Sequence, residues 1–371
     1  MSEEKQESKK EEKVEAPKKL NLGVGADIGT ATIVVAREKA DGSFSIRHHR
    51  NMLYRLGANE EAADLLDRGG YLYVKSGEDY YIVGNDALTF ANAIGGGEII
   101  RPMQDGLLNP KLTKARKLLF HIVKMVVGDP EQPGETLRFS LPANPVDRGS
   151  DFNNEFHESV LRGFFLKMGY EPKPINEAMA NLVMQTPSMA TPDGIKKNSG
   201  YSISFGGGMS NSCVAIEGVS ISQFSNTGCG DFIDRQAAQM TGKPVGIVMR
   251  IKEKSVDLNL DDLDYDEDID EDNIRFSIST YYSEMMRRVL RQISEQLSKK
   301  DHYFEGPLDI VVCGGTSLAP GFVDRLKKVI ATVKLPFEVK DVKLAKDPFY
   351  SVAQGACLAA RGDWEKSKKG E

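Results

Sequence analysis

The sequence has 371 residues, of which 40% are hydrophobic and 27% charged, and its formal net charge is −6. This composition is typical of a globular protein in solution, and the length suits two domains of moderate size. Lysine and arginine are spread along the chain, which argues against a nucleic-acid-binding face. No uncharged apolar run reaches the length of a membrane-spanning helix.

Residues 1–20 mix Glu and Lys with almost nothing to bury, so we predict a disordered charged tail there. The tail has no apolar middle region, so it does not resemble a signal peptide. The four cysteines are far apart, each in an apolar or glycine-rich setting: Cys213, Cys229, Cys313 and Cys357. We expect buried, reduced thiols in a cytoplasmic protein rather than disulfides or a zinc site.

The first element along the chain, LGVGADIGTATIVVA at residues 22–36, has the pattern of a β-hairpin that turns at Gly29. The later stretch YSISFGGGMSNSCVA, from Tyr201, has the same order of strand, glycine turn, small polar residues and a strand ending in Val-Ala. Aligning the two places Asp27 opposite Ser204, about 177 positions later. We therefore predict one supersecondary unit that is used twice.

Between the two hairpins we expect short strands in YLYVKSGEDYYIVG and a helix over about residues 112–127. A second helix is predicted over about residues 152–168, with Gly169 as its stop signal. Its apolar residues recur every four positions, at Phe152, Phe156, Val160, Phe164 and Met168. A further helix is expected near Glu177.

After the second hairpin, the glycine-rich turn NTGCGDFIDRQAAQM contains Asp231, which is placed to start a helix. A longer helix is predicted over about residues 277–299, with an apolar stripe of Ile278, Tyr282, Met285, Val289, Ile293 and Leu297. The segment LDIVVCGGTSLAPGFVDRLKKVI then has the order strand, Gly-Gly turn, helix. This alternation predicts the α/β class with largely buried sheets.

Three glycine-bearing turns follow apolar strands, around Gly29, around residues 206–208 and around residues 314–315. One such turn usually does no more than reverse the chain. Three of them, two matched as a repeat, favour a nucleotide clamped between two related domains, with backbone N–H groups around its phosphates. Mg²⁺ prefers oxygen ligands, so Asp27 is the candidate carboxylate, the alternative being a turn-capping role.

These motifs resemble those of the actin superfamily of ATPases, and within it the filament-forming prokaryotic actins of the MreB and MamK type. ADIGTAT resembles the first phosphate loop, SFGGGMS stands at the second, and RPMQDGLL is close to a stretch typical of MreB. CGGTSLAPGFVDRL is similar to the adenosine loop, IVMRIKEK to the helix that reaches ribose and adenine, and KDPFYSVAQGA to the closing connector helix. The resemblance covers about residues 22–362 in the family's order.

The resemblance implies an α/β actin-like ATPase fold, with duplicated ribonuclease-H-like domains and a nucleotide cleft between two lobes. The first lobe would comprise residues 21–175 and 346–371, with a small subdomain at about 53–97. The second would comprise residues 176–345, with a small subdomain at about 232–300.

The resemblance also implies the residues of the site. Asp27 would orient the water shell of Mg²⁺, and Glu177 would help to position the attacking water, although without the resemblance Glu177 is an ordinary exposed residue at the start of a helix. Lys252 and Glu253 would contact the sugar and base. The residues expected to contact ATP or ADP are Gly29, Thr30, Ala31, Thr32, Ser204, Gly206, Gly207, Gly208, Met209, Ser210, Gly228, Gly230, Lys252, Glu253, Gly314, Gly315, Thr316 and Ser317.

Two residues depart from the family's pattern. Ser204 stands where the second phosphate loop has Asp, and Met209 where it has the first of two Thr. Losing the charge-assisted contacts of that Asp in a dry site costs a few kcal/mol of transition-state stabilisation, or about a hundredfold in rate. The glycine N–H groups remain, so we expect a protein that binds ATP and hydrolyses it slowly.

Three further features have some character of a binding site. Nine of the twelve residues 261–272 are acidic, but the run lacks the glycine and glutamate spacing of an EF-hand, so we predict a solvated insertion or a docking patch for a cargo or adaptor protein. Where MreB proteins carry a membrane loop, GDPEQPGETL has no adjacent bulky apolar pair, so we expect no direct membrane insertion. His48 and His49 are adjacent in a strand, which does not suit a metal pair.

We therefore expect a cytoplasmic prokaryotic cytoskeletal protein that binds ATP and Mg²⁺, forms filaments with itself, hydrolyses ATP slowly and positions an organelle or other cargo. Roles in cell shape or plasmid segregation are alternatives. A different class of function is a non-polymerising actin-fold adaptor with a degenerate ATPase site, which Ser204 and Met209 favour and Glu177 opposes. A sugar kinase or DnaK-type chaperone of the same superfold fits less well, since neither kinase insertions nor a peptide-binding domain is evident. No direct contact with nucleic acid is expected.

Overall fold

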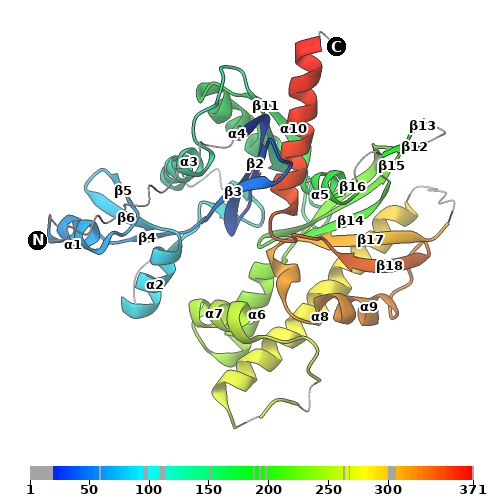
Figure 1. Cartoon of the computed structure of the whole chain (residues 1–371). Coiled ribbons are helices and arrows are strands. Elements are labelled where there is room, and N and C mark those ends of the chain that lie inside the picture. Colours follow the sequence, from blue (N-terminus) through cyan, green and yellow to red (C-terminus); the bar gives the residue numbers. More distant parts are fainter. Residues whose placement is uncertain are drawn as a thin grey trace, which may run out of the picture.

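The computed structural model describes residues 20–57, 60–94, 99–108, 113–150, 152–186, 189–191, 194–196, 199–261, 264–266, 268–299 and 306–369. The predicted charged tail lies outside these residues, apart from its last position. The described chain forms two large mixed sheets covered by helices, which confirms the α/β class (Figure 1).

The first large sheet has the strand order β11-β10-β1-β2-β3. Its strands are β1 (Leu20–Ile28), β2 (Thr32–Lys39), β3 (Phe44–Arg50), β10 (Thr136–Leu141) and β11 (Glu171–Asn176). The second has the order β16-β15-β14-β17-β18. Its strands are β14 (Gly200–Phe205), β15 (Met209–Ile216), β16 (Val219–Thr227), β17 (Leu308–Cys313) and β18 (Val339–Leu344).

The two sheets repeat one topology. In each, three consecutive antiparallel strands are followed by two strands that add in parallel beside the first. Asp27 pairs with Val34 and Ser204 with Asn211, so in both hairpins the partner lies seven positions further along the chain. The predicted duplication and the alignment of Asp27 with Ser204 are therefore confirmed. We call the part built on the first sheet the first lobe and the part built on the second sheet the second lobe.

Two helices join the lobes along their shared side. Helix α5 (Glu177–Gln185) follows β11 and packs on β14 and β15, whereas α10 (Ser351–Lys369) follows β18 and packs on β1, β10 and α5 (Figure 1). A Cβ atom at Gly355 would lie 1.8 Å from the carbonyl oxygen of Ala180. Only glycine allows this close approach of the two helix backbones.

A smaller sheet extends from the first lobe, with the order β5-β6-β4-β7. Its elements are β4 (Leu53–Arg55), α1 (Glu60–Gly69), β5 (Tyr73–Ser76), β6 (Asp79–Val83), α2 (Asn85–Ile94) and β7 (Ile99–Ile100), so the strands predicted in YLYVKSGEDYYIVG are present. Short hairpins are formed by β8 (Met103–Gln104) with β9 (Leu107–Leu108) and by β12 (Met189–Thr191) with β13 (Gly194–Lys196).

Two outer helices cover the first lobe. Helix α3 (Thr113–Val127) agrees with its prediction, whose first residue lies outside the described part of the chain. Helix α4 (Glu155–Lys167) starts three residues later than predicted, and its fully buried residues are His157, Leu161 and Phe165, while Phe156 is 38% exposed. The predicted stripe is offset by one residue, about 100°, from the buried face, so Val160, Phe164 and Met168 pack against the core but are only partly buried.

The second lobe is covered by α6 (Gly230–Thr241), α7 (Val245–Ser255), α8 (Asp270–Ser298), the short 3₁₀ helix η2 (Gly315–Leu318) and α9 (Phe322–Ile330). All members of the apolar stripe predicted for α8 are buried. The helix starts seven residues before the predicted residue 277, because Asp270, Glu271 and Asp272 suit a helix N-terminus. The end of the predicted acidic insertion is therefore helical.

The remaining sequence predictions concern cysteines, histidines and the membrane. All four cysteines are buried free thiols, as expected. His48 contacts the rings of Phe349 and Tyr350, while His49 lies against Gly84, so the two imidazoles point to different neighbours. Across the described ranges, no helix combines the length and apolar character needed to cross a bilayer.

Candidate functional site

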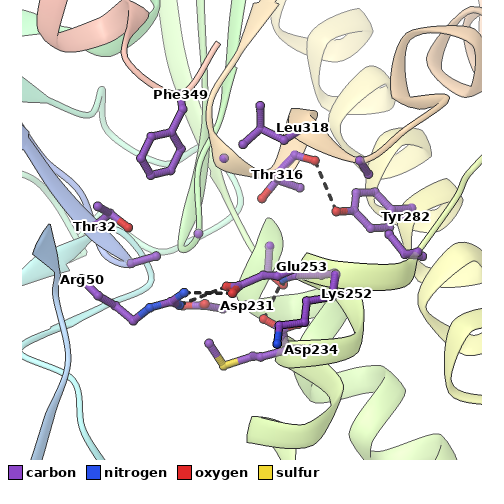
Figure 2. Close-up of a pocket in the computed structure, with 18 of the residues that line it drawn as sticks. Thr32, Arg50, Asp231, Asp234, Lys252, Glu253, Tyr282, Thr316, Leu318 and Phe349 are labelled. Carbon is purple, nitrogen blue, oxygen red and sulfur yellow. Dashed lines mark hydrogen bonds and ion pairs between the residues drawn. The ribbon is translucent and has the colours of Figure 1, made fainter. Parts of the chain in front are cut away.

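Two adjoining cavities lie between the lobes. The smaller, of about 80 Å³, lies between the tips of the two hairpins, and the larger, of about 530 Å³, extends toward α7 and η2. They share the wall residues Ala31, Thr32, Gly207, Gly315 and Phe349. A ligand with a small polar end and a bulkier remainder fits this pair of spaces, and Figure 2 shows the larger one.

The glycines of the second hairpin tip pack closely against the first hairpin tip and against the turn at Gly106. A Cβ atom at Gly208 would lie 2.4 Å from the backbone nitrogen of Gly106 and 2.7 Å from Oγ1 of Thr30. A Cβ atom at Gly207 would lie 2.9 Å from Cβ of Ala31. Glycine at these positions leaves backbone N–H groups from both lobes around one small space, which is a setting that binds anions.

Two carboxyl groups and one hydroxyl meet at the floor of the smaller cavity. Asp27 is the second-to-last residue of β1. Glu177 is the first residue of α5, because the side chain of Asn176 caps that helix at the N–H of Met179. The Ser204 hydroxyl donates a hydrogen bond of 3.3 Å to Oε2 of Glu177. The duplicated strands thus bring Asp27 and its counterpart Ser204 to the same end of the cleft.

The protein raises the pKa of both carboxyl groups. Desolvation is the main cause for Glu177, the negative charge of Asp27 adds to the rise, and the hydrogen bond from Ser204 opposes it. Desolvation also raises the pKa of Asp27, while the Ser140 hydroxyl opposes the shift. The pair therefore favours a bound proton or a cation, either of which relieves the repulsion between the two groups.

The chemistry of these donors fits Mg²⁺ held mainly by phosphate and water. Asp27, Glu177 and Ser204 offer only oxygen atoms, which Mg²⁺ prefers. Among the described residues, no group of three or more His, Cys, Asp or Glu side chains is arranged to hold a metal. One or two carboxylates beside a phosphate pocket are what a largely hydrated Mg²⁺ uses.

Met209 lies beside the smaller cavity and is 3% exposed. A Cβ atom at Gly106 would lie 2.4 Å from Cγ of Met209, so the thioether packs directly on the turn between β8 and β9. Where the family pattern has a hydroxyl, this chain therefore has an apolar contact between the lobes.

The larger cavity is bordered by the Gly-Gly turn and η2. Gly314 has φ +96°, and a Cβ there would lie 2.3 Å from the carbonyl oxygen of Phe205. Thr316 Oγ1 donates to the carbonyl oxygen of Gly206 over 2.7 Å, and the Tyr282 hydroxyl donates to that of Thr316 over 3.3 Å. These bonds tie the turn to the second hairpin, and Leu318 with Phe349 supplies apolar surface for a flat ring (Figure 2).

Lys252 and Glu253, consecutive residues of α7, contact different lobes at this cavity. Lys252 Nζ lies 2.7 Å from Oδ2 of Asp234 and 3.1 Å from the carbonyl oxygen of Gly230, both on α6. Glu253 turns to the first lobe, where Arg50 binds both of its carboxylate oxygens, over 3.0 and 2.8 Å (Figure 2).

Most of the residues expected at the site line one of the two cavities. Those that do are Asp27, Gly29, Thr30, Ala31, Thr32, Glu177, Ser204, Gly206, Gly207, Gly208, Met209, Gly230, Lys252, Glu253, Gly314, Gly315 and Thr316. Ser210 and Ser317 are buried next to them, and Gly228 lines a separate small cavity beside α8. Their roles stay predictions.

Sequence reasoning missed several residues of the cavity walls. They are Arg50, Arg101, Gly106, Asp234, Met249, Tyr282, Leu318 and Phe349. Gly106 and Phe349 lie within the quoted motifs RPMQDGLL and KDPFYSVAQGA, which gave a usable signal. Arg101, Met249 and Leu318 also lie within quoted motifs, whereas Arg50 has no local signal, because its partner Glu253 lies about 200 residues away along the chain.

The profile of the family named Volactin matches residues 22–360 of the chain. The chain belongs to the volactin family. No curated protein matches it.

Solved structures identify the fold of this volactin-family chain. The structure described as "MamK double helical filament" has a TM-score of 0.63 at 16% identity, covering 91% of this chain and 98% of that one. MreB 5 of Spiroplasma citri bound to AMPPNP gives 0.61 at 14% identity, covering 94% and 98%. The ethanolamine utilization protein EutJ from Carboxydothermus hydrogenoformans gives 0.51 at 15% identity, covering 93% and 91%.

These similarities confirm that the chain has the actin-like fold that the sequence motifs predicted. At such low identity they establish the fold and leave ligand, activity and assembly to be argued from this chain's own residues.

Proposed function

We propose that this protein is an actin-like cytoskeletal protein that binds ATP with Mg²⁺ between its lobes, hydrolyses it slowly and forms filaments with itself. The observation that carries the proposal is the duplicated glycine hairpin, whose two tips meet beside two carboxyl groups at the narrow end of a larger cavity. The lobe and subdomain boundaries given above, and a cytoplasmic location, are part of the same proposal.

The hairpin tips would hold the phosphates. Backbone N–H groups next to Gly29 and at Gly207 and Gly208 would present partial positive charge to them, and the glycines themselves add no side chain to the space. The nucleoside would occupy the larger cavity, with its base near Phe349 and Leu318 and its sugar near Glu253. Bound MreB 5 in the compared structures carries AMPPNP in one case and ADP in another, which supports a nucleotide here.

The carboxyl groups would divide the catalytic work. Bound Mg²⁺ would supply positive charge at the phosphates, with Asp27 holding its water shell. Glu177, with its raised pKa, would accept or hold a proton of the attacking water. Ser204 places a neutral hydroxyl where a second charged group would orient that water, so we expect binding to be efficient and hydrolysis slow.

Filament formation would follow from closure of the lobes. A nucleotide that contacts both hairpins binds the closed arrangement best and so increases its population. The compared MamK structure is described as a double helical filament, which supports self-assembly as the output for this fold. Cargo positioning, with the acidic residues around 261–272 as a docking patch, is the proposed cellular task.

The experiment is sedimentation and electron microscopy of the purified protein with ATP and Mg²⁺, with a non-hydrolysable analogue, and without nucleotide. We expect filaments with both nucleotides and phosphate release that lags far behind assembly. The absence of filaments well above micromolar protein concentration would refute the cytoskeletal role. If isothermal titration calorimetry detected no ATP binding, the proposed nucleotide site between the lobes would be refuted.

A second candidate function is a non-polymerising adaptor. Ser204, which replaces a charged group, and the apolar Met209 contact across the cleft are the observations in its favour. ATP binding with no filaments under any nucleotide would select this function.

A further inference from the structure

One side chain of the second lobe is buried in the core of the first. Met249 on α7 is 5% exposed and belongs to the hydrophobic cluster of the small sheet, together with Met52, Tyr54, Leu66, Tyr80, Ile82 and Ala87. Every other member of that fully buried cluster comes from the first lobe. The outer parts of the two lobes are therefore joined above the larger cavity by an apolar contact that excludes water.

An ion pair with preset geometry lies next to this contact. Arg50 binds both oxygens of Glu253 across the cleft, and its Nε donates to Oδ1 of Asn85 over 3.0 Å. The Asn85 contact fixes the guanidinium plane, so less side-chain freedom is lost when Glu253 arrives. A two-bond arginine–carboxylate pair is also more directional than a single contact.

A second arginine of the first lobe contacts two helices of the second lobe next to this ion pair. Arg101 of the first lobe lies 2.8 Å from Oδ1 of Asp231 on α6 and 3.3 Å from the sulfur of Met249. Its side chain is 24% exposed and that of Asp231 13%, so water weakens this pair less than it weakens a surface pair. All three contacts lie among the residues that line the larger cavity.

We propose that Met249, Arg50 with Glu253, and Arg101 with Asp231 form a clasp that closes the cleft over the nucleotide and sets the rate at which nucleotide leaves. The inference rests on the proposed function for its ligand, whereas the clasp itself is a contact within this chain. Glu253 serves both the clasp and the sugar end of the cavity, so opening the clasp and releasing the nucleoside are one event.

The first test measures nucleotide exchange. The wild-type protein, Arg50→Met, Met249→Ala and the double variant are loaded with fluorescent ATP and chased with unlabelled ATP in a stopped-flow instrument. We expect roughly fivefold faster dissociation for each single variant and more for the double variant, because each loses a cross-lobe contact. Unchanged rates would overturn the gating role.

Controls separate the clasp from general damage. Arg68→Met removes an exposed ion pair with Asp64 in the same small subdomain, and Met240→Ala removes a side chain that is 70% exposed on α6. Both should exchange nucleotide at the wild-type rate. Met249→Leu keeps the volume and apolar character of the side chain, so it should exchange nucleotide slowly, as the wild type does, even if Met249→Ala folds poorly.

The second test needs no nucleotide. Spin labels at Arg68→Cys and Met240→Cys report the separation of the outer parts of the lobes by pulsed electron resonance, and the native cysteines are buried. We expect one narrow distance distribution in the wild-type background, a broader and longer one with Arg50→Glu, and recovery with Arg50→Glu combined with Glu253→Arg. A distribution that none of these changes alters would overturn the clasp, whatever the result for ATP binding.

Discussion

At the scale of single residues, Ser204 distinguishes the second hairpin from the first. It occupies the position that Asp27 occupies in the duplicated unit, and it donates its hydroxyl hydrogen to Glu177. A neutral donor stabilises Glu177 without adding a third carboxylate to a poorly hydrated site. With serine rather than aspartate at position 204, the site lacks a charge that would order water around the phosphates.

We predict that Ser204→Asp raises the rate of ATP hydrolysis about tenfold to a hundredfold, because a charged acceptor would orient the attacking water in the transition state. Phosphate release under saturating ATP and Mg²⁺ measures this. Ser204→Ala is the matched control and should not raise the rate, since it removes the hydroxyl without adding charge. An unchanged or lower rate for Ser204→Asp would show that another feature, such as Met209, limits turnover.

The raised pKa of Glu177 determines how the free energy of unfolding changes with pH. Its pKa is raised in the folded protein, so the native state binds its proton more tightly than the unfolded chain does. The free energy of unfolding therefore falls as pH rises from the ordinary range of a glutamate, near 4.5, through the raised pKa. A pKa that is higher by one in the folded state than in the unfolded state corresponds to about 1.4 kcal/mol.

We predict that Glu177→Gln is more stable than the wild type at pH 9 and gains much less at pH 5, since the amide carries no charge to desolvate. Urea unfolding at both pH values, in EDTA and without nucleotide, measures the difference. Glu295→Gln, on the exposed side of α8, is the control and should follow the wild type at both pH values. If Glu177→Gln changed the free energy of unfolding equally at pH 5 and pH 9, the pKa of Glu177 would not be raised in the folded protein.

At the scale of elements, the packing of α10 on α5 depends on the absence of a Cβ atom at Gly355. Gly355 brings α10 so close to α5 that a Cβ would overlap the carbonyl oxygen of Ala180, which is backbone and cannot move aside. Gly362, on the same helix, has no atom within 4 Å of the position that a Cβ would take. The two glycines therefore differ in packing while sharing a helix.

We predict that Gly355→Ala destabilises the protein by about 2 kcal/mol or more, as overpacking does. Gly362→Ala should be neutral or stabilising by up to about 1 kcal/mol, because alanine favours helix. Chemical unfolding of both variants measures this. Similar stabilities for the two would mean that the α5–α10 contact adjusts freely.

Elements were predictable from the sequence where a local pattern determines the structure. The hairpins, the Gly-Gly turn and the stripe of α8 follow from glycine placement and apolar spacing. The buried face of α4 did not, because several apolar residues lie around that helix and only contact with the sheet selects Leu161 and Phe165. Arg50 and Met249 were missed for a similar reason, since each acquires its role from a partner in the other lobe.

At the scale of the whole molecule, the duplicated topology explains why the site lies where it does. Each sheet carries its glycine hairpin at the same position, so two lobes that face each other bring the hairpin tips together. The cross-lobe contacts of Arg50, Arg101 and Met249 then close the wider end of the cleft. Anything that binds at both hairpins therefore stabilises the lobes as one unit.

We predict that ATP with Mg²⁺ stabilises the protein by about 2.7 kcal/mol at a ligand concentration one hundred times Kd. Adding EDTA should remove much of this gain, because Asp27 and Glu177 repel each other and the phosphates unless a cation lies among them. Thermal unfolding with ATP, with and without EDTA, measures the effect. In Asp27→Asn combined with Glu177→Gln the loss on adding EDTA should be smaller, because less negative charge then needs compensation. An equal gain from ATP with and without Mg²⁺ in the wild type would show that backbone N–H groups alone neutralise the phosphates.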